Sequence, residues 1–219
     1  MDDLRIAIPK GRNLKPSVEL LNYIGIDFRE LLTPSRKLLI KGANSNVEAV
    51  IVRDADIPTY VEQGAADIGI AGSDQLAEQR KDLYEPVDLK FGYCKMVVAA
   101  PKEFLRANQA KEFSHLKIAT KFPTITEEYF LKRGIEIEVI KLYGSIELAP
   151  LTDLSEQIVD LVSTGETLRE NGLVAIEDIM DVTARLVVNR ASMRVKAKTI
   201  KRIINLIRDA INQMDLAEH

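Results

Sequence analysis

The chain has 219 residues, of which 46% are hydrophobic and 29% are charged, and its formal net charge is −3. These values are ordinary for a soluble globular protein, so they exclude a chain that is disordered throughout. The slightly negative charge does not favour a general nucleic-acid-binding protein, but it leaves room for a local anion site.

Cysteine usage and the N-terminal stretch predict the compartment. The single cysteine, Cys94, excludes an internal disulfide, which suits a reducing cytoplasm. The opening stretch MDDLRIAIPKGR lacks the basic and apolar regions of a signal peptide. No apolar run approaches the roughly 20 residues of a membrane span. We therefore expect a cytoplasmic protein with neither a membrane nor a nucleic-acid partner.

Short apolar segments alternate with helical patterns along the chain. Strands are expected at residues 4–9, 38–42, 48–53, 68–72, 94–101, 117–122, 137–143 and 158–162. Helices are expected at residues 14–26, 57–65, 74–80, 124–134 and 194–214. This alternation predicts an α/β protein with mixed, largely parallel sheets.

Two stretches are candidate crossings between lobes, at residues 90–95 and 177–189. We expect one lobe to comprise residues 1–91 plus 181–219 and the other to comprise residues 92–180. The segment 194–214 places five isoleucines at helical spacing, Ile200, Ile203, Ile204, Ile207 and Ile211. This pattern predicts a helix packed on the first lobe, and the alternative is partner docking through its basic outer face.

The stretch IVDLVSTGETL, residues 158–168, carries an unusual polar pattern at the end of a strand. A strand that ends in a glycine turn and opens a helix directs free backbone N–H groups outward, which favours phosphate binding. Gly165 lets the backbone approach an anion. Asp160 would repel a phosphate, so its carboxylate suits a ribose diol instead. The alternative is structural, because Ser163 and Glu166 have the spacing of a capping box.

Basic residues follow two other predicted strands. Lys10 and Arg12 lie in PKGR after the first strand, and Arg53 follows the strand at 48–53. The carboxyl ends of strands in α/β sheets are the usual place for ligands, and guanidinium groups bind phosphate in two places at once. The alternatives are a solvated basic turn and an ion pair of Arg53 with Asp54 or Asp56.

Other polar residues have a structural and a functional interpretation side by side. Asp74 in IAGSD is either a helix N-cap or a ligand contact. Gly144, Ser145 and Glu147 in YGSIELAP are explained by a turn and a helix start as well as by a binding loop. Lys95 lies at the expected crossing and is a candidate for substrate contact.

The remaining candidates favour structural roles. Arg36 and Lys37 in SRKLL are surface charges unless they contact substrate phosphates or another subunit. Cys94 is expected to pack in the core, and neither His115 nor His219 shows ligand spacing. No H-x-x-H or C-x-x-C pattern indicates a metal fixed by the protein.

Five longer stretches together resemble the ATP phosphoribosyltransferase family. They are RIAIPKGR (5–12), SRKLL (35–39), VRDADIPTYVEQGAADIGIAGSD (52–74), DLKFGYCKMVVAAP (88–101) and IKLYGSIELAPLTDLSEQIVDLVSTGETLRENGL (140–173). The resemblance covers nearly the whole chain in the right order. The loop at Asp160 also resembles the ribose-5-phosphate loop of Rossmann-like phosphoribosyltransferases, but that family usually places two adjacent acids before the loop, and here Val159 precedes Asp160.

The resemblance implies transfer of the 5-phosphoribosyl group from phosphoribosyl pyrophosphate to N1 of ATP, the first step of histidine biosynthesis. It implies two lobes similar to type II periplasmic binding proteins, an active site in the cleft between them, and Mg²⁺ held mainly by pyrophosphate. Because the chain ends after one long helix, it is similar to the short form. That form pairs a catalytic subunit with a regulatory chain related to histidyl-tRNA synthetase. It is expected as a homodimer alone and as a hetero-octamer with the partner.

The resemblance also implies roles for particular residues. The residues that bind phosphoribosyl pyrophosphate are Asp160, Leu161, Val162, Ser163, Thr164, Gly165, Glu166 and Thr167. The catalytic residues facing pyrophosphate or the ATP phosphates are Lys10, Arg12 and Arg53. The residues lining the nucleotide side of the cleft are Asp74, Lys95, Gly144, Ser145 and Glu147.

Two other functions remain compatible with parts of the sequence. The first is a non-catalytic module that binds a small solute or anion on the same two-lobe fold, for which GAADIGIAGSD is equally suitable. The absence of a signal peptide pattern and the presence of the phosphate loop argue against it. The second is a Rossmann-like phosphoribosyltransferase acting on a free base, against which the single acid before the loop and the N-terminal KGR both count.

Overall fold

The computed structural model describes residues 3–33, 36–44, 46–107 and 116–217. It divides the chain into two compact units, which are described separately. Unit 1 comprises Met1–Gly92 and Thr183–His219, and unit 2 comprises Tyr93–Val182. The chain passes between them after Gly92 and after Val182, whereas the sequence predicts boundaries after residues 91 and 180.

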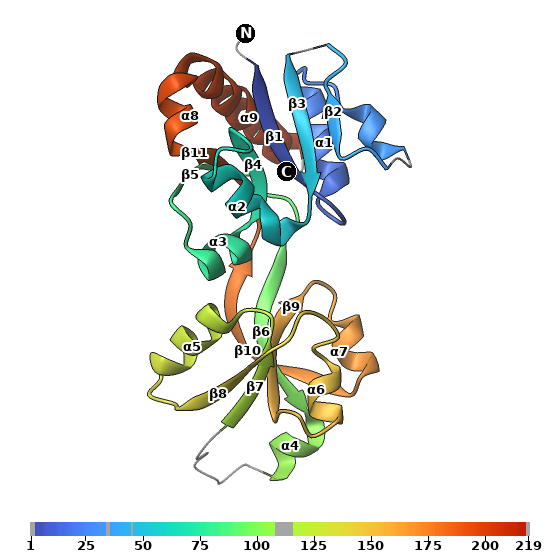
Figure 1. The fold of residues 1–219 in the computed structure, drawn as a ribbon. Helices are drawn as coiled ribbons and strands as arrows, with labels where there is room; N and C mark the ends of the chain where they lie inside the picture. Colours follow the sequence, from blue (N-terminus) through green and yellow to red (C-terminus); the bar gives the residue numbers. More distant parts are fainter. Residues whose placement is uncertain (1–2, 34–35, 45, 108–115, 218–219) are drawn as a thin grey trace. The chain divides into compact units, whose positions relative to one another are not determined.

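A six-stranded sheet forms the centre of unit 1, in the order β2-β3-β1-β4-β11-β5 (Figure 1). Its strands are β1 (Leu4–Pro9), β2 (Leu39–Lys41), β3 (Val47–Val52), β4 (Ile68–Gly72), β5 (Leu83–Asp88) and β11 (Ala184–Asn189). Strand β1 is parallel to both β3 and β4, and the other three pairings are antiparallel. The carboxyl ends of β1, β3 and β4 therefore lie at one edge of the sheet, where α/β proteins usually bind ligands.

Helices cover both faces of this sheet. They are α1 (Leu14–Tyr23), α2 (Ile57–Glu62), α3 (Ser73–Gln79), α8 (Arg190–Val195) and α9 (Ala197–Ala217), with short 3₁₀ helices η1 (Arg29–Leu32) and η2 (Asp54–Asp56). Helices α1 and α9 share a core with Ile6 and Ile8 of β1, whereas α2 and α3 share a second core with Ala7. Because side chains alternate along a strand, the two cores lie on opposite faces of the sheet.

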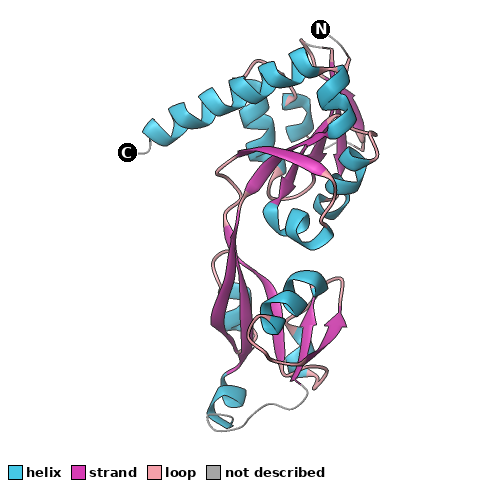
Figure 2. Ribbon diagram, turned by 90° about the vertical axis from the view of Figure 1, so that its left-hand side faces the viewer, coloured by secondary structure: helices cyan, strands magenta, loops and turns pink. Residues whose placement is uncertain are grey.

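The predicted apolar face of the C-terminal helix is confirmed. Its five isoleucines, Ile200, Ile203, Ile204, Ile207 and Ile211, are at most 7% exposed and belong to the larger core of unit 1. Figure 2 shows the long helix α9 running to the C-terminus. The helix begins at Ala197 rather than at residue 194, because the preceding residues form the separate helix α8. Asn189 caps α8 by accepting a hydrogen bond from the Ser192 N–H at 2.8 Å.

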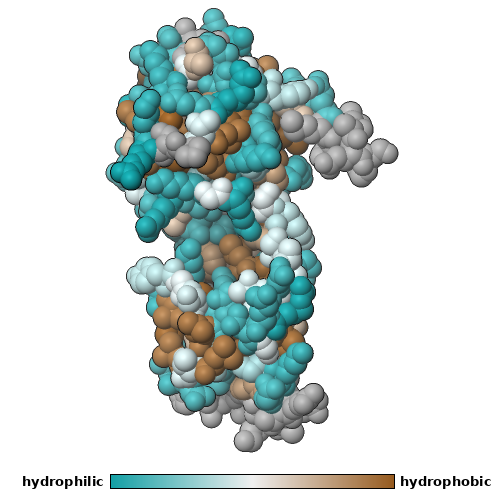
Figure 3. Space-filling model, turned by 90° about the vertical axis from the view of Figure 1, so that its right-hand side faces the viewer, coloured by the Kyte–Doolittle hydropathy of each residue, from teal (hydrophilic) through white to brown (hydrophobic). Residues whose placement is uncertain are grey.

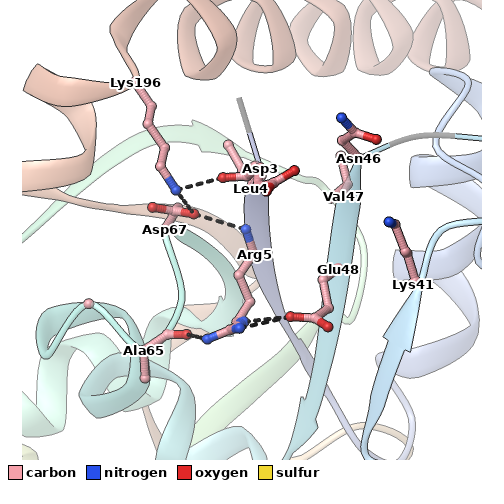
Figure 4. A pocket seen from close by; sticks show the side chains of 11 residues that line it. Asp3, Leu4, Arg5, Lys41, Asn46, Val47, Glu48, Ala65, Asp67 and Lys196 are labelled. Atoms are coloured by element: carbon pink, nitrogen blue, oxygen red, sulfur yellow. Dashed lines mark hydrogen bonds and ion pairs between the residues drawn. The ribbon is translucent and has the colours of Figure 1, made fainter. Parts of the chain in front are cut away.

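A polar pocket of about 360 Å³ lies at the edge of this sheet where β1 and β3 begin (Figure 4). Asp67 lines it, and its carboxylate accepts hydrogen bonds from Lys196 Nζ at 2.8 Å, Ser192 Oγ at 2.6 Å and the Arg5 backbone N–H at 2.9 Å. Burial of Asp67 disfavours its charged form, but these hydrogen bonds together outweigh burial and hold the pKa of Asp67 below its ordinary value. Asp67 therefore ties α8 and the start of α9 to β1.

Replacing Asp67 by alanine is expected to lower the free energy of unfolding at pH 7 by about 2 kcal/mol, because buried donors lose their acceptor. The pKa of Asp67 is lower in the folded protein, so its stabilising effect is present above the unfolded pKa and is lost as pH falls through the folded pKa. The difference from the unmodified chain should therefore shrink below about pH 4. Urea unfolding over a pH series measures this.

The matched control is Glu48→Ala in the same pocket, whose carboxylate pairs with Arg5 at 2.8 Å on the exposed surface. An exposed ion pair contributes about 0–1 kcal/mol, so this variant should remain close to the unmodified chain. Equal losses in the two variants would contradict the role given to Asp67.

A five-stranded sheet forms the centre of unit 2, in the order β10-β6-β9-β7-β8. Its strands are β6 (Cys94–Pro101), β7 (Leu116–Thr120), β8 (Ile137–Lys141), β9 (Gln157–Val162) and β10 (Leu173–Val182). Its helices are α4 (Lys102–Ala107), α5 (Pro123–Leu131), α6 (Leu148–Leu151) and α7 (Glu166–Glu170). Strand β7 is parallel to both β8 and β9, while β6 is antiparallel to β9 and β10. Helices α6 and α7 share one core, and Figure 1 shows α5 on the other side of the sheet.

The prediction of mixed α/β sheets is confirmed, but the share of parallel pairing is smaller than the sequence suggests. Of the nine strand pairings among the described residues, four are parallel and five are antiparallel. The antiparallel pairings come largely from strands that the sequence does not predict, namely β5, β10 and β11. Irregular register in β10, between Ala175 and Glu177 and again between Asp178 and Met180, breaks the alternation that identifies a strand.

The α6 side of unit 2 exposes apolar side chains (Figure 3). Leu148, Leu151 and Leu154 are 42–52% exposed there. Exposed apolar surface of this kind is typical of protein association. No helix in the described part of the chain is both long and apolar enough to cross a membrane.

Candidate active site

The carboxyl ends of β7, β8 and β9 meet at one edge of the unit 2 sheet, because these three strands run parallel. Lys121 follows β7, the turn at Gly144 and Ser145 follows β8, and the segment from Asp160 to Thr167 comprises the end of β9 and the loop after it. Three segments that are distant in the sequence therefore contribute polar groups to one edge. This edge is the position at which α/β sheets usually bind ligands.

The loop after β9 turns sharply at Gly165, whose φ is +73°. A side chain other than glycine is strained in this region, so the turn depends on glycine. Ser163, Thr164, Glu166 and Thr167 are exposed, which leaves three hydroxyl groups open to solvent. Leu168 is buried in the core that it shares with α6, so it attaches the loop to this core. Leu161 and Val162 are half-buried at the end of β9.

The alternative of a capping box at this loop is wrong. Gly165, not Ser163, occupies the N-cap position of α7, and no side chain caps the helix. The Glu166 N–H instead donates a long hydrogen bond of 3.4 Å to Thr164 Oγ1. The positive φ of Gly165 moves the helix start two residues beyond Ser163. The hydroxyl of Ser163 is therefore not used to close the helix.

Asp160 is half-buried in β9, and its Oδ1 accepts a hydrogen bond of 2.8 Å from the Leu161 N–H. The pKa of Asp160 is raised to about 6, mainly by burial and in smaller part by the Glu147 carboxylate, while the Leu161 hydrogen bond and Lys121 act in the opposite direction. A carboxyl group with such a pKa at a strand end is typical of functional sites. The parallel register that pairs Thr120 with Val159 places the following residues, Lys121 and Asp160, side by side, and Glu147 lies in the turn that follows β8 at the same sheet edge.

Lys121 is a further candidate for the site, and the sequence does not single it out. It lies inside the segment predicted as the strand 117–122, whereas β7 ends at Thr120 and leaves Lys121 at the carboxyl edge. The signal is the same as for Lys10 and Arg53, a basic residue directly after a strand.

The turn after β8 has an unusual backbone. Ser145 has a φ of +50°, and its carbonyl accepts a hydrogen bond of 3.2 Å from the Leu148 N–H. Glu147 precedes α6 without capping it through its side chain. An added Cβ at Gly144 would meet no atom within 4 Å, so the backbone of this turn is open.

Unit 1 presents its own set of basic residues at the carboxyl edge of its sheet. Lys10 and Arg12 follow β1, Arg53 follows β3, and all three are exposed. Lys10 is joined to β3 by a hydrogen bond of 2.9 Å from its N–H to the Val52 carbonyl. In the described part of the chain Arg53 forms no ion pair with a neighbouring aspartate, so that alternative is not realised.

Lys10 also lines a cavity of about 450 Å³ together with Arg36 and Lys37. The structure thus brings Arg36 and Lys37 close to Lys10, although 25 residues lie between Lys10 and Arg36 in the sequence. Lys37 forms an ion pair with Glu30 at 3.2 Å, and this pair neutralises part of the positive charge of Lys37. Three basic residues around one cavity favour an anionic ligand.

Asp74 is not the N-cap of its helix, which corrects that alternative. Helix α3 begins at Ser73 with Gly72 at the N-cap, and Asp74 lies in the first turn with only 2% of its surface exposed. Its Oδ2 accepts a hydrogen bond of 2.9 Å from Gln75 Nε2. An added Cβ at Gly72 would collide with the Asp74 carboxylate. The glycine is therefore needed for Asp74 to occupy this position.

Lys95 and Cys94 lie on β6 near the start of unit 2. Lys95 forms an ion pair with Asp178 of β10, and this hydrogen bond raises the pKa of Lys95. A substrate contact by Lys95 would have to compete with Asp178. Cys94 is buried, as predicted. His115 and His219 lie outside the described residues.

Sequence similarity to known proteins identifies the family of this chain. Residues 53–209 match the family model HisG, described as ATP phosphoribosyltransferase. The ATP phosphoribosyltransferase of Geobacter metallireducens is 58% identical over 203 residues, covering 93% of this chain and 96% of that protein. The chain belongs to the ATP phosphoribosyltransferase family. An ATP phosphoribosyltransferase of Caldanaerobacter subterraneus is also 51% identical over 213 residues, covering 97% and 99% of the two chains.

Solved structures agree with this assignment. The ATP phosphoribosyl transferase (HisG:HisZ) complex from Thermotoga maritima contains a chain with a TM-score of 0.80 and 33% identity, covering 96% of this chain and 99% of that one. The periplasmic aliphatic sulphonate binding protein SsuA from Escherichia coli has a TM-score of 0.59 at 13% identity, covering 98% and 74%. The second likeness shows the fold alone.

The predicted family, fold class and function are therefore confirmed. As a member of the ATP phosphoribosyltransferase family, the chain is an enzyme of histidine biosynthesis that transfers a phosphoribosyl group to ATP. The alternative of a non-catalytic binding module is not favoured, because the relatives at 51–58% identity are named as transferases.

Proposed function

We propose that the carboxyl edge of the unit 2 sheet binds the ribose 5-phosphate part of phosphoribosyl pyrophosphate during this transfer. The single observation that carries the proposal is the juxtaposition of Asp160 with the glycine turn and its exposed hydroxyl groups. A phosphate is bound by Ser163, Thr164 and Thr167 and by the backbone N–H groups around Gly165.

Asp160 binds the ribose hydroxyl groups in this proposal. A carboxylate accepts two hydrogen bonds from a vicinal diol, and hydrogen bonds to a charged acceptor are about twice as strong as neutral ones. Its half-buried position at the end of β9 reduces competition from water. Because only the ionised carboxylate accepts both bonds, substrate binding favours loss of the Asp160 proton.

The basic edge of unit 1 binds phosphates. Arg12 and Arg53 suit forked contacts with pyrophosphate or with the ATP phosphates, and Lys10 supplies a point charge. Arg36 and Lys37 extend the same positive surface around the cavity beside Lys10. We assign Asp74, Lys95, Gly144, Ser145 and Glu147 to the nucleotide and the remaining substrate surface.

The proposed chemistry requires positioning and charge stabilisation rather than a protein nucleophile. N1 of the adenine attacks the anomeric carbon, the bond to pyrophosphate breaks, and positive charge develops on the ribose ring. Mg²⁺ enters as part of the phosphoribosyl pyrophosphate substrate, since pyrophosphate oxygens are ligands that this ion prefers. The described residues contain no group of three or more histidine, cysteine or acidic side chains that would hold a metal on its own.

We propose that the protein acts in the cytoplasm with a separate regulatory chain related to histidyl-tRNA synthetase. The similarity to a chain of the HisG:HisZ complex from Thermotoga maritima supports such a partner. A homodimer in isolation and a hetero-octamer with the partner are the proposed assemblies. The exposed leucines of unit 2 are consistent with association.

The test is an assay of the purified chain with ATP, phosphoribosyl pyrophosphate and Mg²⁺, with and without the regulatory chain. Pyrophosphate release and the near-ultraviolet absorbance of N1-substituted adenine are followed together. Product that requires both substrates supports the proposal. No product in either condition, combined with binding of a small solute, would favour the binding module instead.

A further inference from the structure

The backbone of the phosphate loop is held from one side by a single residue. Arg169 lies in the last turn of α7, and its Nη1 donates a hydrogen bond of 3.1 Å to the Thr164 carbonyl. The backbone N–H of the same residue donates to the Gly165 carbonyl, also at 3.1 Å. Two successive carbonyl groups of the loop therefore point toward Arg169.

The orientation of these carbonyl groups fixes the orientation of the N–H groups. In a trans peptide the C=O and the N–H point in opposite directions, so a carbonyl held by Arg169 leaves the next N–H directed away from it. The peptide joining Thr164 and Gly165 accordingly presents the Gly165 N–H on the side of the loop opposite Arg169. Because glycine has no side chain and tolerates many backbone conformations, this peptide would be free to rotate at Gly165 in the absence of a restraint.

The surroundings of Arg169 show that this restraint is its main interaction. Among the described residues its guanidinium forms no ion pair with a carboxylate, and its side chain is exposed. An added Cβ at Gly165 would lie 3.5 Å from Arg169 Nη1, so the side chain lies directly over the turn. Glu166 offers the loop only the long hydrogen bond of 3.4 Å from its N–H to Thr164 Oγ1.

We infer that Arg169 is a positioning residue for phosphate binding, which holds the Thr164–Gly165 peptide so that the Gly165 N–H faces the 5-phosphate. This inference rests on the proposed function of the loop. The side chain acts through the backbone and does not touch the substrate. Its positive charge lies within one helical turn of the loop and adds to the favourable potential for an anion there.

The test measures binding of ribose 5-phosphate and of ribose by calorimetry, together with steady-state kinetics, for Arg169→Ala and Arg169→Lys. Arg169→Ala should weaken ribose 5-phosphate binding and raise the KM for phosphoribosyl pyrophosphate by about tenfold, which corresponds to one hydrogen bond to a charged group. Binding of ribose and the KM for ATP should be unchanged. Arg169→Lys retains a donor and should recover most of the loss.

The control is Glu170→Ala, which changes the neighbouring exposed residue of the same helix and should bind ribose 5-phosphate normally. Melting temperatures separate loss of folding from loss of binding, and the lysine variant carries the test if the alanine variant fails to fold. Ribose 5-phosphate binding by Arg169→Ala within twofold of the unmodified chain would overturn the inference and leave the proposed function intact. Failure of the unmodified chain to bind ribose 5-phosphate would overturn the proposed function itself.

Discussion

Replacing Asp160 by asparagine is expected to lower kcat/KM for phosphoribosyl pyrophosphate by about 100-fold, because two hydrogen bonds from the ribose diol lose their charged acceptor. The side chain keeps its size, so the half-buried site at the end of β9 retains its packing. Removal of a partly buried carboxyl whose pKa is raised should not lower the melting temperature. Steady-state kinetics with saturating ATP measure the effect.

The same carboxyl predicts a pH dependence. The pKa of Asp160 is raised to about 6 by burial and by Glu147, so a growing fraction is protonated below this pH in the free enzyme. Only the ionised form accepts both diol hydrogen bonds, so kcat/KM for phosphoribosyl pyrophosphate should fall about tenfold per pH unit on the acidic side. Asp160→Asn should abolish this limb of the profile.

Asp153→Asn is the matched control for Asp160. This exposed aspartate of the same unit has a φ of +55°, which asparagine also tolerates, and it should leave both kcat/KM and the pH profile unchanged. An Asp160→Asn variant with the kinetics of the unmodified chain would contradict the role given to Asp160. A retained acidic limb would show that another group causes it.

Replacing Arg12 by alanine is expected to lower kcat by about 100-fold, because a preorganised cation no longer stabilises the charge on the departing pyrophosphate. Lys10→Ala should act in the same direction but less strongly, since an ammonium group makes point contacts rather than forked ones. Both side chains are exposed, so either change should lower the melting temperature by no more than about 2–4 °C. Single-turnover measurements separate this effect on chemistry from substrate binding.

Lys15→Ala is the matched control for this pair. Lys15 is an exposed basic residue of α1 that follows Arg12 closely in the sequence, and its ion pair with Glu19 is long, at 3.8 Å. It should change kcat by less than about twofold if charge acts only at the sheet edge. Full turnover in both Arg12→Ala and Lys10→Ala would show that unit 1 binds the phosphates elsewhere.

Local sequence patterns predicted the elements that depend on local physics. Strands β1 and β4 lie exactly at the apolar runs that indicated them, and the isoleucine spacing correctly predicted the buried face of α9. The loop after β9 was located because glycine and hydroxyl residues cluster at a strand end. The sequence is compatible with either a phosphate-binding loop or a capping box, and the positive φ of Gly165 excludes the capping box.

Features that depend on distant segments were not predictable from the sequence. Lys121 and Asp160 come together only because β7 and β9 pair in parallel, although 38 residues lie between them in the sequence. Strand β10 has irregular register at Glu177 and Asp178, so its sequence lacks a strand pattern. Its antiparallel pairing with β6 is determined by tertiary structure. The sequence leaves Asp74 open between a helix N-cap and a ligand contact, because it does not show that the Asp74 carboxylate is buried against Gly72.

The most direct test of the central claim is the amide proton spectrum of Gly165 during titration with ribose 5-phosphate and, separately, with ribose. If the loop after β9 binds the 5-phosphate, the Gly165 N–H resonance should shift downfield with ribose 5-phosphate and remain unchanged with ribose, because a backbone N–H donates to the phosphate. Saturable shifts confined to residues outside 160–167, with Gly165 unmoved, would contradict the assignment of this loop as the phosphate site.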